Sequence, residues 1–247
     1  MFHASAALLM QHLLFVFLLV VAPIWDLYET RRLKRNPGSK QKIGYYKTLC
    51  TWLWIASALA VVVAGSRPLV FIRPSPGEIS WLLPHPWVRS VAGALIAAMA
   101  VIGVVLPVGI VLWKKLTKRP RKYASADALK SLSYFLPATR RERRWWVFIC
   151  VTAGVCEEIL FRGFLLQYLH VSPGTLDLTL ALLASSAIFG VNHLYQGAGG
   201  VAGSAVTGFL LGLLFLLSGN LLYPVLLHAV LDLRMLAILR PPADNGS

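Results

Sequence analysis

Seven apolar runs, most of them long enough to cross a lipid bilayer, divide this 247-residue chain. In hydrocarbon every backbone N–H and C=O must be paired within the chain, so runs of this kind are expected to be α-helices. Hydrophobic residues make up 57% of the sequence and charged residues 14%, which excludes an ordinary soluble domain. The sequence predicts an all-α, polytopic membrane bundle of about seven transmembrane helices. We expect them at about residues 4–28, 45–65, 88–113, 145–169, 178–194, 201–217 and 222–239.

The net charge of +14 is concentrated between the predicted helices. Most Lys and Arg residues lie in two loops, 31–47 and 114–144. Such loops are typical of the cytoplasmic side of a membrane, and they can also contact anionic lipid headgroups. Seven alternating spans would place both loops inside, the N-terminus outside and the C-terminus in the cytoplasm. We therefore expect an integral protein of the inner or plasma membrane, with the lipid bilayer as a partner and no nucleic acid.

The second basic loop contains residues 125–136, in which apolar residues recur at helical spacing. This pattern is compatible with an interfacial amphipathic helix on the inner membrane face and with a solvated linker. No internal repeat is visible, so we expect one integrated domain. Within it, residues 1–144 would form an N-terminal region of three membrane helices with basic cytoplasmic loops. Residues 145–247 would form a C-terminal core of four helices.

The fourth predicted helix carries Glu157, Glu158 and Arg162 inside an otherwise apolar run. One charge at the bilayer centre costs at least about 2.5–3.5 kcal/mol, so three within about one and a half turns require a reason. Glu158 and Arg162 are four residues apart and can pair on one helix face. Glu157 points about 100° away from Glu158 and gains no local partner. We expect Glu157 to face other groups in the bundle.

Later helices supply groups that this carboxylate could meet. His193 lies at the end of the fifth predicted helix, and His228 and Asp232 are four residues apart on the seventh. Asp232 can accept a hydrogen bond from the imidazole, or both can face one ligand. One carboxylate and two imidazoles from three helices can hold a metal or activate a water molecule. The alternative is structural: a membrane histidine often only bonds a neighbouring helix, and the Glu158–Arg162 pair can be purely structural.

Three motifs contain these residues: E-E-x-x-x-R at 157–162, F-x-x-x-H at 189–193 and H-x-x-x-D at 228–232. In this order, on successive helices, they resemble the motifs of the CPBP intramembrane proteases, also called the CAAX-protease and bacteriocin-processing or Abi family. The similarity covers roughly residues 145–239. The resemblance implies a glutamate-dependent intramembrane metalloendopeptidase, so that the four C-terminal helices would be the catalytic core. Its substrate would be a membrane-anchored protein or peptide.

By this resemblance, Glu157 would activate the attacking water with help from His193. His228 and Asp232 would stabilise the oxyanion or share in metal binding, and the rest of the first motif would support the site. An Asn in place of Asp232 could donate to an oxyanion, whereas an ionised Asp cannot, which favours a metal. The candidate catalytic residues are Glu157, Glu158, Arg162, His193, His228 and Asp232, and the candidate ligands of a divalent metal such as zinc are Glu157, His193, His228 and Asp232.

Two other functions are compatible with the same residues. A proton- or cation-coupled transporter also buries Glu, His and Asp in its helices, although it predicts repeats and broken helices. A non-catalytic membrane scaffold or immunity protein could keep the fold without the activity, and it predicts that Glu157→Gln leaves function intact. For a protease, the sequence does not choose among prenylated CAAX proteins, bacteriocin leader peptides and membrane-anchored regulators as substrates. It leaves the oligomeric state open as well.

Overall fold

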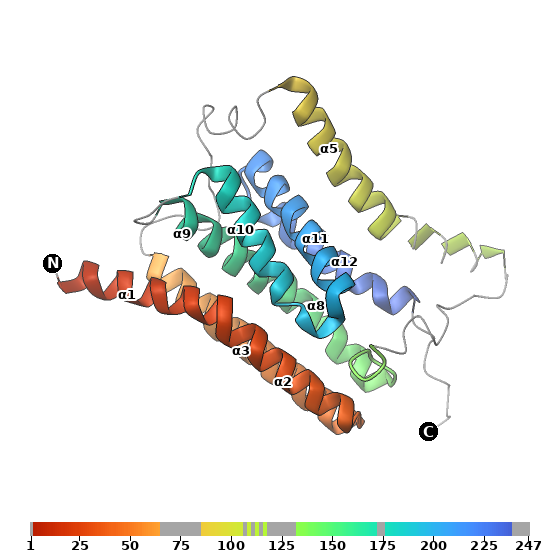
Figure 1. The fold of residues 1–247 in the computed structure, drawn as a ribbon. Helices are drawn as coiled ribbons and strands as arrows, with labels where there is room; N and C mark the ends of the chain where they lie inside the picture. Colours follow the sequence, from red (N-terminus) through yellow and green to blue (C-terminus); the bar gives the residue numbers. More distant parts are fainter. Residues whose placement is uncertain are drawn as a thin grey trace.

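The computed structural model describes residues 2–64, 85–105, 108–109, 112–113, 116–117, 132–171 and 176–238. Within these ranges all regular elements are helices, which confirms the predicted all-α bundle (Figure 1). Three rods come from the N-terminal part of the chain. They consist of α1 (Phe2–Val16), the π-helical η1 (Phe17–Val21) and α2 (Ala22–Arg35), then α3 (Ser39–Ala64), and then α5 (Pro86–Ala100) with the π-helical η2 (Val101–Val105).

Four further rods follow. The first of them is unbroken from residue 140 to residue 171, and a short 3-10 turn precedes the third. These elements are α8 (Arg140–Glu158), the π-helical η3 (Ile159–Leu165) and α9 (Leu166–Val171), then α10 (Leu178–Val191), then η4 (Leu194–Gln196) with α11 (Gly197–Ser218), and finally α12 (Leu222–Ile238).

Four helical segments are long and apolar enough to cross a membrane: Ala6–Arg35, Ser39–Ala64, Pro86–Val105 and Leu194–Ser218. The rod that contains Glu157 is not among them, because three charged residues interrupt its apolar run. Helix α12 has 17 residues and α10 has 14, so both are shorter than these four. The shorter and more polar rods are thus those that contribute the predicted site residues.

Two sequence predictions about the loops have different outcomes. Residues 31–35, predicted to lie in a loop, continue α2, because Thr30 and Leu33 are buried against the bundle and hold this turn in place. The predicted amphipathic segment at 125–136 lies mostly outside the described residues, and residues 132–135 form a turn.

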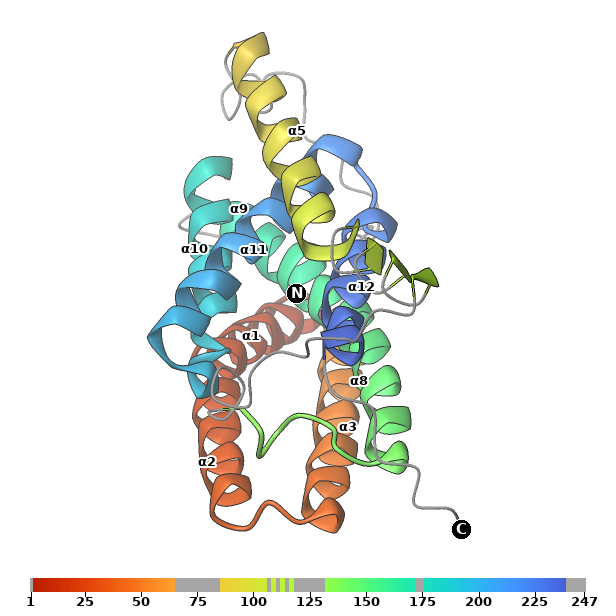
Figure 2. The ribbon, with the colours of Figure 1, turned by 90° about the vertical axis from the view of Figure 1, so that its right-hand side faces the viewer.

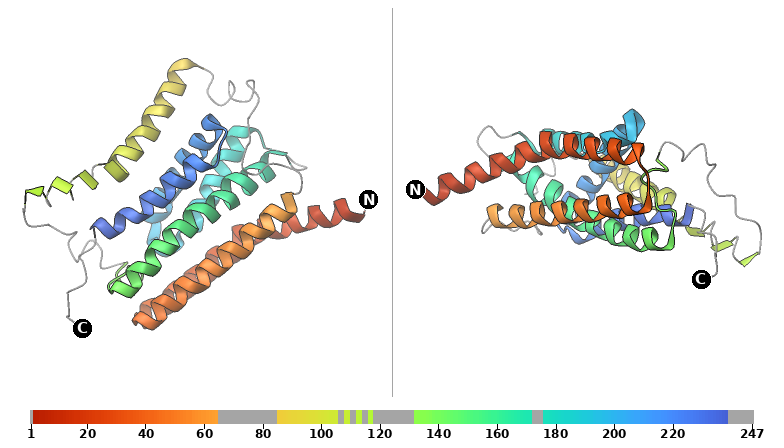
Figure 3. Two further views of the ribbon diagram at one scale, coloured as in Figure 1. Left: turned by 180° about the vertical axis from the view of Figure 1, so that it is seen from behind. Right: turned by 90° about the horizontal axis from the view of Figure 1, so that it is seen from below.

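The rods pack side by side around α8. Helices α3 and α12 flank it, as Figure 3 shows from behind, and α10 packs along α11. Helix α5 lies at the edge of the bundle against α11. Helices α2 and α3 are neighbouring rods joined by a short turn at one end (Figure 2). Two of the N-terminal rods, α1–η1–α2 and α3, therefore cover one side of the C-terminal four, and α5 lies on the opposite side (Figure 1).

A glycine sets the distance between α8 and α12. A Cβ atom on Gly154 would lie 2.9 Å from the Cβ atom of Ala229 and 3.0 Å from its backbone nitrogen. No larger side chain fits without moving α12. Because His228 precedes Ala229, this close approach brings the imidazole up to the glutamates one turn beyond Gly154.

The turn before α8 is fastened to the start of α3. The ammonium of Lys42, which is 5% exposed, donates hydrogen bonds to the carbonyls of Ser133 at 3.0 Å and Leu136 at 2.9 Å. It also lies 3.8 Å from a carboxylate oxygen of Glu142. Glu142 and Thr139 form a capping box at the first turn of α8. These contacts fix where the helix that carries Glu157 begins.

Candidate active site

The first motif straddles a change of helix type. Helix α8 ends at Glu158, and the π-helical η3, which contains Arg162, continues it directly. Such π turns are rare and are frequently found at functional sites. Arg162 donates from Nη1 to Glu158 Oε1 at 2.8 Å and from Nη2 to the Gly208 carbonyl of α11 at 2.9 Å. The predicted Glu158–Arg162 pair is therefore formed, and it also ties α8 to α11.

Glu158 holds a second partner from a distant helix. Nδ1 of His228 donates a hydrogen bond to the same Glu158 Oε1 at 2.7 Å. Glu158 is fully buried and Arg162 is 3% exposed, so this three-residue network is closed to solvent. Nε2 is consequently the nitrogen of His228 that remains for other partners. The sequence did not identify Glu158 as the residue that orients His228.

Asp232 stands further from His228 than a hydrogen bond allows. Its Oδ2 is 3.7 Å from His228 Nε2, beyond the usual donor–acceptor range. Of the two arrangements open from the sequence, the direct hydrogen bond is therefore not the one observed. The Asp232 side chain is 41% exposed, the most open of the three carboxylates around this imidazole.

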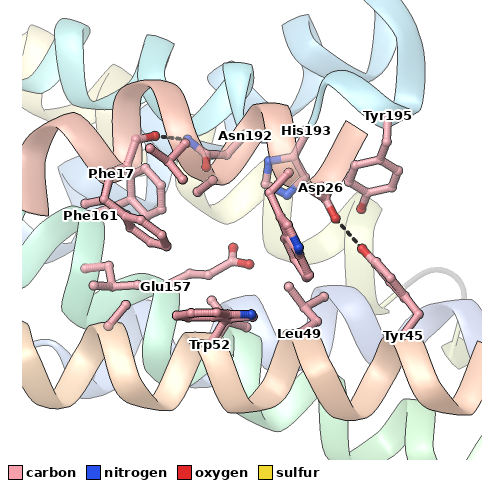
Figure 4. A pocket seen from close by; sticks show the side chains of 17 residues that line it. Phe17, Asp26, Tyr45, Leu49, Trp52, Glu157, Phe161, Asn192, His193 and Tyr195 are labelled. Carbon is pink, nitrogen blue, oxygen red and sulfur yellow. Dashed lines mark hydrogen bonds between the residues drawn. The ribbon is translucent and has the colours of Figure 1, made fainter. Parts of the chain in front are cut away.

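Each of the two glutamates has one buried oxygen, Oε2, without a hydrogen-bond partner among the described residues, and the one that lines a cavity is Glu157. Its Oε2 lies 3.8 Å from His228 Nε2, and this buried atom has no hydrogen-bond partner among the described residues. The side chain is 17% exposed and lines a cavity of about 180 Å³. Figure 4 shows its carboxylate directed into this space. Glu157 therefore faces other groups of the bundle, as its place in the sequence predicted.

His193 lies two residues beyond α10 and lines the same cavity. Its Nδ1 donates to the Phe189 carbonyl at 2.8 Å, so in the neutral imidazole Nε2 carries the lone pair. The Phe189 ring centroid is 4.7 Å from that of His193, 5.9 Å from that of His228 and 4.7 Å from the Arg162 guanidinium. The aromatic residue of the second motif thus packs against a residue of each motif and spaces them.

The opposite wall of the cavity comes from the N-terminal rods (Figure 4). Phe17, Trp25 and Trp52 line it, together with Asp26, whose carboxylate accepts a hydrogen bond from Tyr45. Sequence reasoning placed no site residue in this region. An aspartate within the first apolar run was the signal that could have indicated one.

The donor atoms near Glu157 are of the types that zinc binds, namely carboxylate oxygens and imidazole nitrogens. However, no group of three or more His, Cys, Asp or Glu side chains in the described ranges is arranged to hold a metal ion. One nitrogen of His228 is taken by Glu158, and the other is 3.8 Å from Glu157 and 3.7 Å from Asp232. A metal at Glu157, His193, His228 and Asp232 would need these groups to close further, and it stays a prediction.

Comparison with known proteins supports the family resemblance. Residues 140–234 match a family model described as type II CAAX prenyl endopeptidase Rce1-like. The match covers less than half of the chain, begins where α8 begins and includes all three motifs. No curated protein and no solved structure was found to match the chain. The family match and the long apolar helices together identify an integral membrane protein.

Proposed function

We propose, on the basis of the match of residues 140–234 to the Rce1-like type II CAAX prenyl endopeptidase model, that this chain is an intramembrane endopeptidase in which Glu157 activates the attacking water. The observation that carries the proposal is the contrast between the two glutamates. Oε2 of each glutamate lacks a hydrogen-bond partner among the described residues, but Glu158 is fully buried with its Oε1 occupied by two donors, whereas Glu157 lines a cavity that His193 also lines.

Peptide hydrolysis requires a base, a polarised water and a donor for the oxyanion. A water beside Glu157 can give one proton to the carboxylate and donate its second hydrogen to Nε2 of His193. Its oxygen then attacks the carbonyl carbon of the substrate. When the C–N bond breaks, Glu157 returns the proton to the leaving nitrogen, so that the products are an acid and an amine.

In this proposal His228 acts on the oxyanion. With Nδ1 held by Glu158, a doubly protonated His228 can donate from Nε2 toward the side on which Glu157 lies. Arg162 acts indirectly, because it positions the Glu158 carboxylate, and that carboxylate positions His228. Asp232 reaches the same nitrogen from its more exposed side, where it can hold a water or, if a metal is bound, a ligand position.

The proposed substrate is a membrane-anchored protein or peptide, because the cavity lies between helices of a lipid-embedded bundle. The basic residues at the end of α2 and at the start of α8 favour a cytoplasmic position for this end of the molecule. This orientation places the N-terminus outside and the C-terminus in the cytoplasm.

The test is a product analysis with the purified full-length chain in nanodiscs. Wild type, Glu157→Gln and Glu29→Gln are incubated with membrane-anchored reporter peptides, and new termini are identified by mass spectrometry. Glu29 is a matched control, since it pairs only with the exposed Arg32 at 3.5 Å among the ion pairs of the described residues. Cleavage by wild type and Glu29→Gln but not by Glu157→Gln is expected. Undiminished cleavage by Glu157→Gln would refute the role of this carboxylate.

A further inference from the structure

A second carboxylate lines the cavity that Glu157 faces. Asp26 is 9% exposed and accepts a hydrogen bond from the Tyr45 hydroxyl. Figure 4 shows Asp26 apart from Glu157 and next to Tyr45. An ionisable residue within a membrane helix is costly and points to a function. The proposed hydrolysis makes no use of it.

The walls around Asp26 are aromatic. The rings of Trp25 and Tyr45 are stacked, with centroids 6.4 Å apart and planes inclined by 12°. Phe17 and Trp52 form a second aromatic pair, also 6.4 Å apart. No Lys or Arg is among the described residues that line the cavity. The cavity therefore combines two carboxylates with aromatic faces and apolar surface.

Such surroundings favour one class of ligand. Aromatic faces and carboxylates attract a cation, and apolar walls suit the methylene stem of a long basic side chain. An anion would meet two carboxylates without a lysine or arginine to offset them. The volume of about 180 Å³ is below the range of about 300–1,000 Å³ that is usual for drug-sized ligands, which suits one inserted side chain.

We propose that Asp26 is a specificity-determining residue, and that this cavity accepts a Lys or Arg side chain of the substrate close to the bond that is cut. The proposal rests on the proposed endopeptidase function for the position of that bond. It gives the N-terminal rods a part in the reaction, because they supply the carboxylate and most of the aromatic wall.

A purely structural role for Asp26 predicts a different outcome. If Asp26 only joined α2 to α3 through Tyr45, its loss would lower the stability of the bundle and slow the cleavage of all substrates by the same factor. The proposed role instead predicts a change in the ratio between substrates that differ by one charge. This ratio is insensitive to the amount of folded protein.

The first experiment needs no variant. The full-length protein in nanodiscs is given N-acylated peptides that differ in one residue, which is Lys, norleucine or Glu, placed in turn at each position around the bond cut. We expect kcat/KM at one position to be about tenfold higher for Lys than for norleucine, because the Lys ammonium can donate a charged hydrogen bond to Asp26 and norleucine has no donor. The value should be lowest for Glu, whose carboxylate repels that of Asp26. Equal rates for Lys and norleucine at every position would overturn the proposal.

The second experiment compares Asp26→Asn with Asp177→Asn. Asn at 26 keeps an acceptor for Tyr45, and Asp177 is an N-cap of α10 that Asn can replace. The Lys-to-norleucine ratio should fall toward 1 in Asp26→Asn and keep its wild-type value in Asp177→Asn. A ratio that survives in Asp26→Asn would show that another group selects the cation, and would overturn the assignment.

Binding separates this proposal from the proteolytic one. The Lys and norleucine peptides are titrated against the Glu157→Gln and Glu157→Gln/Asp26→Asn proteins, and the Kd ratio is measured. A tenfold preference for Lys that depends on Asp26 supports the cation site even if wild type cuts no peptide. If wild type cleaves the peptides but binding shows no such preference, the endopeptidase proposal is retained and the proposed cation site is refuted.

Discussion

Two faces of the α8–η3 rod present adjacent carboxylates to different surroundings. On the closed face, Glu158 is held by Arg162 and His228, and the network is sealed between α11 and α12. On the open face, Glu157 lines a cavity whose other wall comes from η1, α2 and α3. Adjacent residues point about 100° apart around a helix, so Glu158 lies in the closed network while Glu157 faces the cavity.

The largest expected effect is the loss of activity in Glu157→Gln. Removal of a general base lowers kcat by about 10²–10⁴-fold. Because Glu157 forms no hydrogen bond with another described side chain and its Oε2 is 3.8 Å from His228 Nε2, the thermal unfolding temperature of this variant in detergent should stay close to that of wild type. A variant that loses stability as well as activity would break the distinction between the two faces.

Glu158→Ala should show the opposite pattern, with stability lost first. It leaves the buried Arg162 without its partner, and breaking a buried pair costs about 3–5 kcal/mol of the free energy of unfolding. The double variant Glu158→Ala/Arg162→Met should recover part of this loss, since no unpaired charge remains. Thermal unfolding of the single and double variants measures the difference. If the double variant is less stable by the sum of the single effects, the two residues are not coupled.

The sequence predicted the open face better than the closed one. The helical rods of the described residues lie in the predicted apolar runs, and the exposure of Glu157 to other groups followed from its position one residue from a paired glutamate. That Glu158 rather than Asp232 orients His228 could not be predicted, because the contact spans 70 residues and depends on how closely α8 and α12 approach. The helical spacing of His228 and Asp232 suggested a hydrogen bond that is absent, since His228 Nε2 and Asp232 Oδ2 are 3.7 Å apart.

The N-terminal wall was also beyond sequence reasoning. Aromatic residues such as Trp25 and Trp52 are common in membrane helices, and nothing in their spacing marks a cavity. Only the packing of α2 and α3 against the C-terminal rods brings them opposite Glu157. Motifs of local spacing are readable in one sequence, whereas a site wall assembled from distant helices is not.

A smaller effect is expected from closing the gap between α8 and α12. In Gly154→Val the new side chain would press on Ala229, and overpacking typically costs about 1–3 kcal/mol. The displacement should also move His228 from Glu158 and lower activity. Gly93→Val on α5 is the control, because nothing lies within 4 Å of a Cβ atom there. Equal unfolding temperatures and activities in the two variants would show that the helix separation does not position His228.

The smallest effect concerns pH and the start of the same rod. Burial raises the pKa of Glu142. Hydrogen bonds from Ser39 and from the Ala138 and Thr139 amides, together with the charge of Lys42, lower the pKa by more than burial raises it. The pKa of Glu142 therefore lies below its ordinary value of 4.5. A carboxyl group with a lower pKa in the folded state stabilises the protein above pH 4.5, and this contribution is lost as the pH falls through the folded-state pKa.

Glu142→Gln can still form the capping box but has no charge for Lys42, so we expect it to be less stable than wild type by about 1 kcal/mol at pH 7. The unfolding temperatures of the two proteins should converge as the pH is lowered below 4.5 and through the folded-state pKa of Glu142. Thermal unfolding in detergent at a series of pH values measures this convergence. A difference that stays constant down to pH 3 would mean that the carboxylate charge does not fasten this turn, and that the capping geometry alone places the beginning of the helix on which both glutamates depend.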